Sequence, residues 1–467
     1  MPSRYILTTR ILNITYQKIK EIISYELSQV NAVSITLDCW TSIQNYSYLG
    51  VTCHYFTEEL FLNNRTLAIN HLPGRHSCEN ISNALLTIIN EWNIQNKILA
   101  VVTDNAKNMS NISTHLNDYL KNNNIKAQKI HGFGCAAHII NLIVKKLGKI
   151  SNSVSLEALN RTIEFQNQYD ELDEIENISL DDSDLGFLNI YKNLVEKCRK
   201  ISALFHQSLI FQEILSDKQK SLNLQQHNLI QDVQTRWNST FLMLERTKEQ
   251  VDAINEALFD RRLNRKYENL NFDLAEKEML NEAVFILQPF YDATVELSGS
   301  KYATLSIVIP VFQGLINLLD MEMSDSGFSA ALKKVLKHNT LGYIYKYKTL
   351  ENPFLITASY LDLRTKLFVK ISEAKKKEYL HIAKNKIRSL AEDFPGNLKQ
   401  NLKLNESHTI TKVTQIDQSL TESNGKNRLQ VFDFNKDYEA KKTFVKLSNL
   451  DKELYRYILN PRKIRIL

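Results

Sequence analysis

The chain has 467 residues, of which 43% are hydrophobic and 24% charged, a balance that excludes a disordered tail and suits two or three globular domains. Its net charge of +6 permits nucleic-acid binding without requiring it. Five scattered cysteines form no CxxC pair and no segment is apolar enough for a signal peptide or membrane helix, so the sequence predicts an intracellular protein with neither a disulfide framework nor a membrane function.

The first 150 residues are predicted to form an α/β unit. After a lead-in helix over residues 12–27, the apolar periodicity predicts strands over residues 33–38, 46–56 and 60–71, a strand that ends at residue 104, and a short strand at 129–134. It predicts helices over residues 77–92, 106–119 and 135–147. The order β-β-β-α-β-α-β-α is that of the ribonuclease H-like fold, in which the first and fourth strands are neighbours. We therefore expect a mixed sheet flanked by helices.

Two aspartates, Asp38 and Asp104, each end an apolar strand-like run in this unit. If the two strands are neighbours, both carboxylates lie at one edge of the sheet, where ligand sites of α/β folds form. Carboxylate oxygens suit Mg²⁺ or Mn²⁺, and such ions can promote phosphodiester cleavage. The alternative is that each is an ordinary solvated aspartate in a turn. Trp40 and Trp92 are expected in the core.

The rest of the chain is predicted to be largely helical. Eight of the fifteen residues at 170–184 are acidic, which is typical of a solvated linker. We predict the following domains: a helical lead-in at 1–30, the α/β core at 31–150, an acidic linker at 151–186, an all-helical insertion domain at 187–392, a polar and flexible segment at 393–449, and the start of a truncated C-terminal region at 450–467.

Six sequence blocks occur in the order found in one known family. They are Leu37–Ser42 with Tyr46–Tyr55, Val102–Met109, Gly134–Leu142, Asp232–Leu244, Ala358–Lys366, and Pro2–Arg4 ahead of the lead-in helix. In these blocks the chain resembles the hAT superfamily of DNA transposases, and within it the BED-finger, RICESLEEPER-like proteins. The resemblance implies a ribonuclease H-like catalytic core interrupted by a large helical insertion, and a nuclear protein that acts on DNA.

The resemblance also implies roles for single residues. Asp38 and Asp104 match the first two acids of the family's DDE triad. The third, a Glu in a C-terminal Ser-Glu-Arg block, is expected to be absent from this chain, as are the zinc-binding BED finger and most of the dimerisation region. Glu296 is a poor match for the third acid, since its flanks differ from that block and it lies inside the insertion.

Four further residues match family motifs. Cys135 and His138 match a CxxH motif, which the resemblance places near the active site and DNA; from the residues alone, two ligands do not make a zinc site, and a structural role is the alternative. Arg236 and Trp237 match an Arg-Trp pair, with Arg suited to a phosphate and Trp to stacking on a base. Packing beside Phe241 and Leu244 is the alternative for Trp237. Basic clusters at 145–146, 261–266, 375–377 and 462–463 could follow phosphates or be solvated helix faces.

Three functions compete at this stage. The first is a transposase-derived nuclear DNA-binding protein with an incomplete DDE site, weak or inactive in strand cleavage, that binds Mg²⁺ or Mn²⁺ where its site is functional. The second is an active DDE transposase represented by a truncated sequence, and the third is a protein-interaction scaffold. The partners expected are DNA and a further copy of the chain through the missing C-terminal region, without a membrane.

Overall fold

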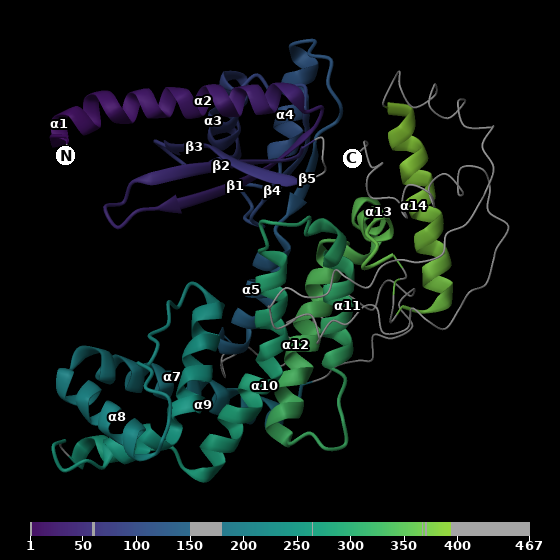
Figure 1. Cartoon of the computed structure of the whole chain (residues 1–467). Coiled ribbons are helices and arrows are strands. Elements are labelled where there is room, and N and C mark those ends of the chain that lie inside the picture. The colour runs from purple at the N-terminus through teal and green to yellow at the C-terminus, as the bar shows by residue number, and fades with distance from the viewer. Residues whose placement is uncertain are drawn as a thin grey trace, which may run out of the picture.

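The computed structural model describes residues 2–57, 61–149, 180–263, 265–366, 368 and 371–393. These residues form a five-stranded sheet with its own helices and a larger helical region, which lies below the sheet in Figure 1. Most of the segment predicted as an acidic linker, and almost all of the chain predicted at 393–467, lie outside the described residues. None of the described helices is long and apolar enough to cross a membrane.

The sheet is mixed and has the strand order β3-β2-β1-β4-β5. β1 pairs antiparallel with β2 and parallel with β4, β2 pairs antiparallel with β3, and β4 pairs parallel with β5. The first and fourth strands are therefore neighbours, which confirms the predicted ribonuclease-like topology. The strands are β1 (Val33–Thr41), β2 (Ser47–Phe56), β3 (Leu62–His71), β4 (Ile98–Thr103) and β5 (His131–Gly134).

Alternation of side chains gives the sheet one buried face. Ile35 and Leu37 of β1 and Val51 and Cys53 of β2 are buried, while the residues between them are not. Helices α2 (Leu12–Gln29), α3 (Cys78–Glu91) and α4 (Ile112–Asn122) lie on the same side of the sheet in Figure 1. Their buried residues belong with those of the strands to one hydrophobic core. The side chains of β1 that point away from this core include Asp38.

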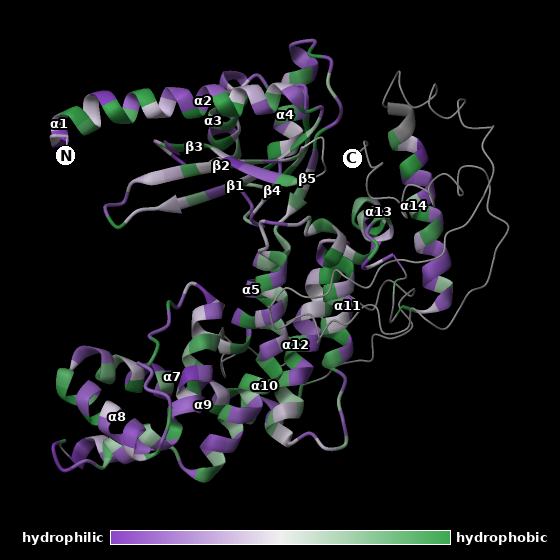
Figure 2. Ribbon diagram, viewed as in Figure 1, coloured by the Kyte–Doolittle hydropathy of each residue, from purple (hydrophilic) through white to green (hydrophobic). Residues whose placement is uncertain are grey.

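The lead-in helix reaches past the sheet at its N-terminal end (Figure 1). α2 is preceded by α1 (Arg4–Ile6) and a π-helical turn, η1 (Leu7–Ile11). Only Ile23 and Leu27 of α2 are buried, and the helix alternates hydrophobic and hydrophilic residues along its whole length (Figure 2). Its C-terminal half therefore anchors it to the sheet.

The helical region contains most of the described helices. It is made of α5 (Ala136–Lys145), α7 (Asp182–Gln207), α8 (Leu209–Ser221), α9 (Trp237–Leu258), α10 (Leu274–Leu297), α11 (Val308–Leu318), α12 (Gly327–Lys346), α13 (Pro353–Leu361) and α14 (Glu373–Asp393), with short 3₁₀ turns η2 (Leu147–Lys149), η3 (Arg265–Leu270), η4 (Leu305–Ile307) and η5 (Thr349–Glu351).

The chain leaves the sheet after β5 and returns to it at α13. Phe354 of α13 packs on His131 of β5 with ring centroids 4.1 Å apart, and on Phe133 at 5.8 Å. Lys386 of α14 lies over the same Phe354 ring. The helices between α5 and α13 thus form an excursion from the sheet, in agreement with the expected insertion.

Two predicted boundaries differ from the structure. The helix expected to close the α/β core, α5, packs in the helical region, since Ile139, Ile140, Ile143 and Val144 belong to the second hydrophobic core. The two cores share no residue: the first draws on residues from Ile23 to Ile130 and the second on residues from Ile139 to Ala383. The boundary therefore falls at Cys135 and not near residue 150.

The second difference is at the acidic run, whose end is helical. α7 begins at Asp182, within the predicted linker 151–186. Asp181 caps the helix by accepting a hydrogen bond from the Asp184 amide, and the Asp184 carboxylate accepts one from the Asp181 amide. This capping box, and the attraction of acidic side chains to a helix N-terminus, explain why the end of the acidic run starts a helix and is not a linker.

Candidate metal and nucleic-acid site

The register of the sheet brings Asp38 and Asp104 to the same level. In the parallel pair of β1 and β4, Thr36 is opposite Val102. Continuing that register by two residues places Asp38, which lies inside β1, opposite Asp104, which directly follows β4. Asp38 is exposed on the open face of the sheet and Asp104 is half-buried. Two oxygen donors thus lie where ligand sites of such sheets form.

Local hydrogen bonds end β4 at Asp104. The Oδ1 atom of Asp104 accepts from the Ala106 amide at 3.1 Å, and the hydroxyl of Thr103 donates to the Asp104 carbonyl at 2.9 Å. An aspartate that binds its own backbone two residues on forms a turn. This turn delays α4, which begins at Ile112 rather than at the predicted Ala106. Within the described residues, the second carboxylate oxygen of Asp104 forms no hydrogen bond.

Two thiols lie close to both carboxylates. Burial, together with the negative charges of Asp38 and Asp104, raises the pKa of the Cys39 thiol to about 11. Burial also raises the pKa of the Cys135 thiol, against the opposing effect of the His138 and Ala137 amides, and both aspartates add to the increase. The effect of both carboxylates on each thiol agrees with the register that places Asp38 beside Asp104. Sequence reasoning missed Cys39, although it follows Asp38 directly.

The start of α5 is fastened to the end of β4. The Cys135 amide donates to the Thr103 carbonyl at 2.7 Å, and Asn105 Nδ2 donates to the Cys135 carbonyl at 3.0 Å. The Asn105 carboxamide lies over Gly134, where a Cβ atom would meet Oδ1 at 1.9 Å. Only glycine allows this approach. Asn105 therefore holds the helical region at a fixed place beside Asp104. The only hint of this role in the sequence is that Asn105 directly follows Asp104.

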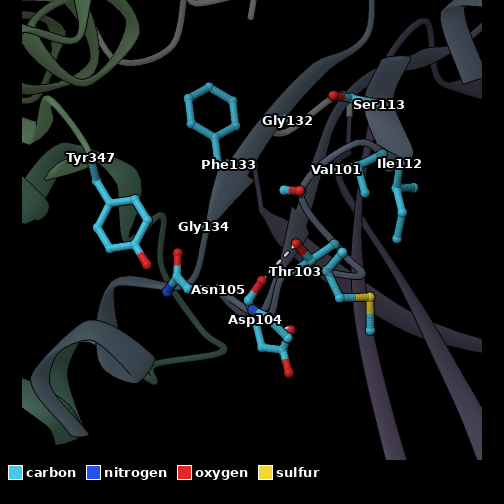
Figure 3. Close-up of a pocket in the computed structure, with 13 residues that line it drawn as sticks. Val101, Thr103, Asp104, Asn105, Ile112, Ser113, Gly132, Phe133, Gly134 and Tyr347 are labelled. Atoms are coloured by element: carbon cyan, nitrogen blue, oxygen red, sulfur yellow. Dashed lines mark hydrogen bonds between the residues drawn. The ribbon is translucent and has the colours of Figure 1, made fainter. Parts of the chain in front are cut away.

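A cavity of about 170 Å³ adjoins Asp104. Residues of β4, β5 and α4 line it together with Tyr347, which follows α12 in the helical region. In Figure 3, the Tyr347 hydroxyl points towards Asn105, and Phe133 and Tyr347 lie on the same side of the cavity. The cavity is thus walled by both parts of the molecule.

The two carboxylates have the chemistry that a hard divalent cation prefers, but they are few. Within the described ranges, no group of three or more His, Cys, Asp or Glu side chains is placed to hold a metal ion. Asp38 and Asp104 offer carboxylate oxygens, and Mg²⁺ commonly keeps several of its waters when one or two carboxylates bind it. Glu296 lies at the end of α10, where its carboxylate accepts a hydrogen bond from Tyr302 at 2.8 Å.

Cys135 and His138 lie at the N-terminus of α5. Cys135 is the N-cap residue and His138 lies in the first turn, and both are partly buried. Within the described residues neither belongs to a group of three metal-ligating side chains, which favours a structural role.

Arg236 and Trp237 are neighbours in the chain but differ in exposure. Arg236 is exposed as the N-cap residue of α9, where a phosphate could reach it. Trp237 is only 4% exposed and packs on Phe241 with ring centroids 6.2 Å apart. A base cannot stack on a ring that the core covers, so the stacking role expected for Trp237 does not fit this structure. Its indole Nε1 has no hydrogen-bond partner in the described part, beside a cavity of about 280 Å³.

The prediction that Trp40 lies in the core is wrong. Trp40 follows Asp38 by two residues and therefore lies on the same open face, where it is 39% exposed and stacks on Tyr48 at 5.8 Å. Trp92 is buried as expected, and its indole nitrogen donates to the Leu67 carbonyl.

The block that contains Arg236 is held by a buried ion pair. The Asp232 side chain is 1% exposed, and both of its oxygens accept from Arg199 Nε, at 3.1 and 2.9 Å. The Thr240 hydroxyl also donates to it at 2.9 Å. Asp232 thus fastens the loop before α9 to α7, a role that the sequence did not reveal.

Comparison with known proteins agrees with this arrangement. Residues 36–130 match the ZBED1 RNase-like domain, and residues 133–283 match the ZBED1 RNase-like helical domain. The junction between the two matches falls within β5, between the last residue of the first hydrophobic core and the first residue of the second.

Several curated proteins are similar to the chain. A protein described as a transcriptional regulator from Talaromyces stipitatus is 30% identical over 63% of this chain and 33% of its own length. A protein named as an AC transposase from Zea mays is 28% identical over 75% of this chain and 38% of its own length. The zinc finger BED domain-containing protein 4 of Homo sapiens is 26% identical over 75% of this chain and 26% of its own length. The chain thus spans well under half the length of each of these three relatives.

Proposed function

Because the chain belongs to the hAT family of transposase-like proteins, we propose that it is a nuclear DNA-binding protein in which Asp38 and Asp104 bind Mg²⁺ or Mn²⁺ and strand cleavage is weak or lost. The placement of these two carboxylates side by side, with Asp38 in β1 and Asp104 directly after β4, is the observation that carries the proposal. A cation bound there would supply Lewis acidity towards a phosphodiester.

The small donor set supports weak cleavage. Two-metal cleavage of a phosphodiester needs ligands for both the ion at the attacking oxygen and the ion at the leaving oxygen. The described residues offer two carboxylates and no larger group of metal-ligating side chains. We therefore expect a single, weakly held cation in this chain, with Asp38 and Asp104 both among its ligands.

Several features support DNA as the partner. The chain carries a net charge of +6, and Arg236 projects from the start of α9 on a loop fixed by Asp232. Relatives named as a transposase and as a transcriptional regulator favour a nuclear role with DNA for this chain as well. The phosphates would be bound by cationic side chains, so affinity should fall steeply with salt.

Titration calorimetry with Mn²⁺ tests the metal site. The wild-type chain should bind Mn²⁺, and both Asp38→Asn and Asp104→Asn should remove the binding. Asp118→Asn, on the exposed side of α4, is the matched control and should bind as the wild type does. Loss of binding in only one of the two variants would contradict a shared site.

Fluorescence anisotropy with labelled DNA tests the partner. We expect the dissociation constant to rise with salt. A plot of its logarithm against the logarithm of the salt concentration should have a slope of roughly 0.7 to 0.9 for each of several phosphate contacts. Affinity that does not change with salt would instead favour a scaffold without a DNA role. Mn²⁺-dependent nicking that disappears in Asp38→Asn would overturn the proposed weakness of cleavage and favour an active transposase.

A further inference from the structure

Two helix ends from distant parts of the chain meet beside the cavity at Asp104. Lys146 follows α5, and Lys346 and Tyr347 end α12. The rings of Tyr343 and Tyr347 are stacked, with centroids 6.1 Å apart and an angle of 10° between their planes. The Lys146 ammonium lies 4.8 Å from the Tyr343 ring centroid, and the Lys346 ammonium lies 5.9 Å from Tyr343 and 5.2 Å from Tyr347.

The cations in this cluster lack a carboxylate. Within the described residues, neither Lys146 nor Lys346 forms an ion pair, whereas Lys197, Lys333, Lys334 and Lys337 of the helical region each pair with an acid. Burial and the nearby charge of Lys346 both lower the pKa of Lys146. Burial, with the charge of Lys146, lowers the pKa of the buried His338. The ammonium groups of Lys146 and Lys346 repel each other beside the Tyr343 ring, and an anion bound between them would relieve this repulsion.

The aromatic part of the cluster faces the candidate metal site. Tyr347 lines the cavity that also contains Asp104, and its hydroxyl points towards Asn105 (Figure 3). Tyr343 and Tyr347 are each partly exposed, and both lysine side chains reach solvent, with the Lys146 ammonium partly desolvated. Cation–π contacts at exposed sites are weak, so either lysine can leave its ring for a phosphate at little cost.

Partly exposed aromatic rings flanked by cations are typical of sites for single-stranded nucleic acid. Bases of a single strand stack on aromatic side chains while lysines neutralise the backbone, whereas the bases of an intact duplex are stacked on one another and are not available. We propose that Lys146, Lys346, Tyr343 and Tyr347 bind a single-stranded segment of nucleic acid, with its phosphates at the lysines and a base on Tyr347, and lead it to Asp104. This inference rests on the proposed function.

The site is independent of Trp237. Trp237 is buried beside α9, whereas the Tyr343–Tyr347 pair is at the end of α12 and next to the sheet. The structure thus offers a surface for an unstacked base at a different place from the one that the family motif suggested.

Anisotropy with a labelled single strand, and with the duplex of the same sequence, tests the proposal on the full chain. The double variant Lys146→Gln with Lys346→Gln should weaken single-strand binding and reduce the salt slope by roughly 1.4, the value for two lost phosphate contacts. The matched control, Lys121→Gln with Lys126→Gln, removes the same charge from exposed positions at and beyond the end of α4 and should leave both quantities unchanged.

A strand that carries 2-aminopurine tests stacking. Tyr347→Leu should lower single-strand affinity by roughly 5- to 100-fold, the loss of one base stack, and should remove the quenching of 2-aminopurine. Tyr347→Phe keeps the ring and should keep both. Thermal unfolding of each variant shows that the fold is intact, since lysines at helix C-termini also stabilise their helices.

The outcomes separate the two proposals. If the wild type binds no nucleic acid, the proposed function fails and this inference with it. If the wild type binds DNA but the lysine and Tyr347→Leu variants behave as the Lys121, Lys126 control does, DNA binding stands and the single-strand site is overturned. Stronger binding to the duplex, with no effect of Tyr347→Leu, would likewise overturn the stacking site.

Discussion

The carboxamide of Asn105 covers Gly134 so closely that a Cβ atom on residue 134 would lie 1.9 Å from Asn105 Oδ1. The same carboxamide donates from Nδ2 to the Cys135 carbonyl at 3.0 Å. Asn105 follows Asp104 and Cys135 begins the path into α5, so one side chain ties the Asp104 end of β4 to the helical region. The absence of a side chain at residue 134 is what makes this tie possible.

Gly134→Ala should therefore destabilise the protein by about 1 to 3 kcal/mol, because the new methyl group must displace a hydrogen-bonded carboxamide. Urea unfolding measures the change. Gly186→Ala is the matched control: a methyl group there meets nothing within 4 Å, and alanine within α7 should stabilise by about 0.5 to 1 kcal/mol. Adding Asn105→Ala to Gly134→Ala should recover part of the loss, and no recovery would contradict the contact as its cause.

The lead-in helix should make stability depend on acid pH through Glu26. Both Glu26 oxygens accept from Arg65 of β3 at 3.0 Å, and the Tyr55 hydroxyl donates to the same carboxylate. The Arg65 hydrogen bonds lower the pKa of Glu26 from its usual 4.5. The charged carboxylate is thus the favoured form in the fold. Its contribution is complete above the usual pKa and is lost as pH falls through the lowered one.

Glu26→Gln should cost about 1 kcal/mol at pH 7, a modest figure because 36% of the Arg65 side chain is exposed and solvent screens the pair. The difference from the wild type should shrink as the pH falls below 4.5. Chemical unfolding at several pH values measures it. Glu21→Gln, at an exposed position of α2, should show no such trend. A constant difference across this range would contradict the carboxylate's role.

Trp237 should act through packing. Trp237→Ala should cost about 3 to 5 kcal/mol, since it empties a site that is 4% exposed. Trp237→Phe should cost far less, because it keeps an aromatic ring beside Phe241 and removes an indole nitrogen that has no partner. Its affinity for DNA should stay within about twofold of the wild type, well below the loss of one base stack. A larger loss of DNA affinity in a folded Trp237→Phe chain would restore the stacking role.

The sheet and the aspartates could be predicted because their signals are local or follow from element order. Alternating apolar residues around Ile35 and Leu37 indicate a strand with one buried face, and the order of elements places β1 beside β4. That adjacency places Asp38 beside Asp104. The same alternation places Trp40 on the exposed face with Asp38. The prediction of a buried Trp40 failed because aromatic residues in strands are also common in cores.

Other features depend on packing that no local pattern encodes. The apolar face of α5, with Ile139 and Ile143, shows that the helix is buried and does not show against which neighbours. The spacing of Trp237 and Phe241 fits both a packed helix face and a base-stacking residue. Lys146 and Tyr343 lie far apart in the chain, and only the meeting of two helix ends brings them together.

The separation of the two hydrophobic cores also orders events during synthesis. Among the described residues, the core between the sheet and its own helices ends in sequence at Ile130, and the later core residues belong to the helical region. A growing chain can therefore bury the first core while the residues after α5 are still being translated, since domains fold as units from the N-terminus. The nascent sheet then presents Asp38 and Asp104 before Tyr347 exists to wall the cavity beside them.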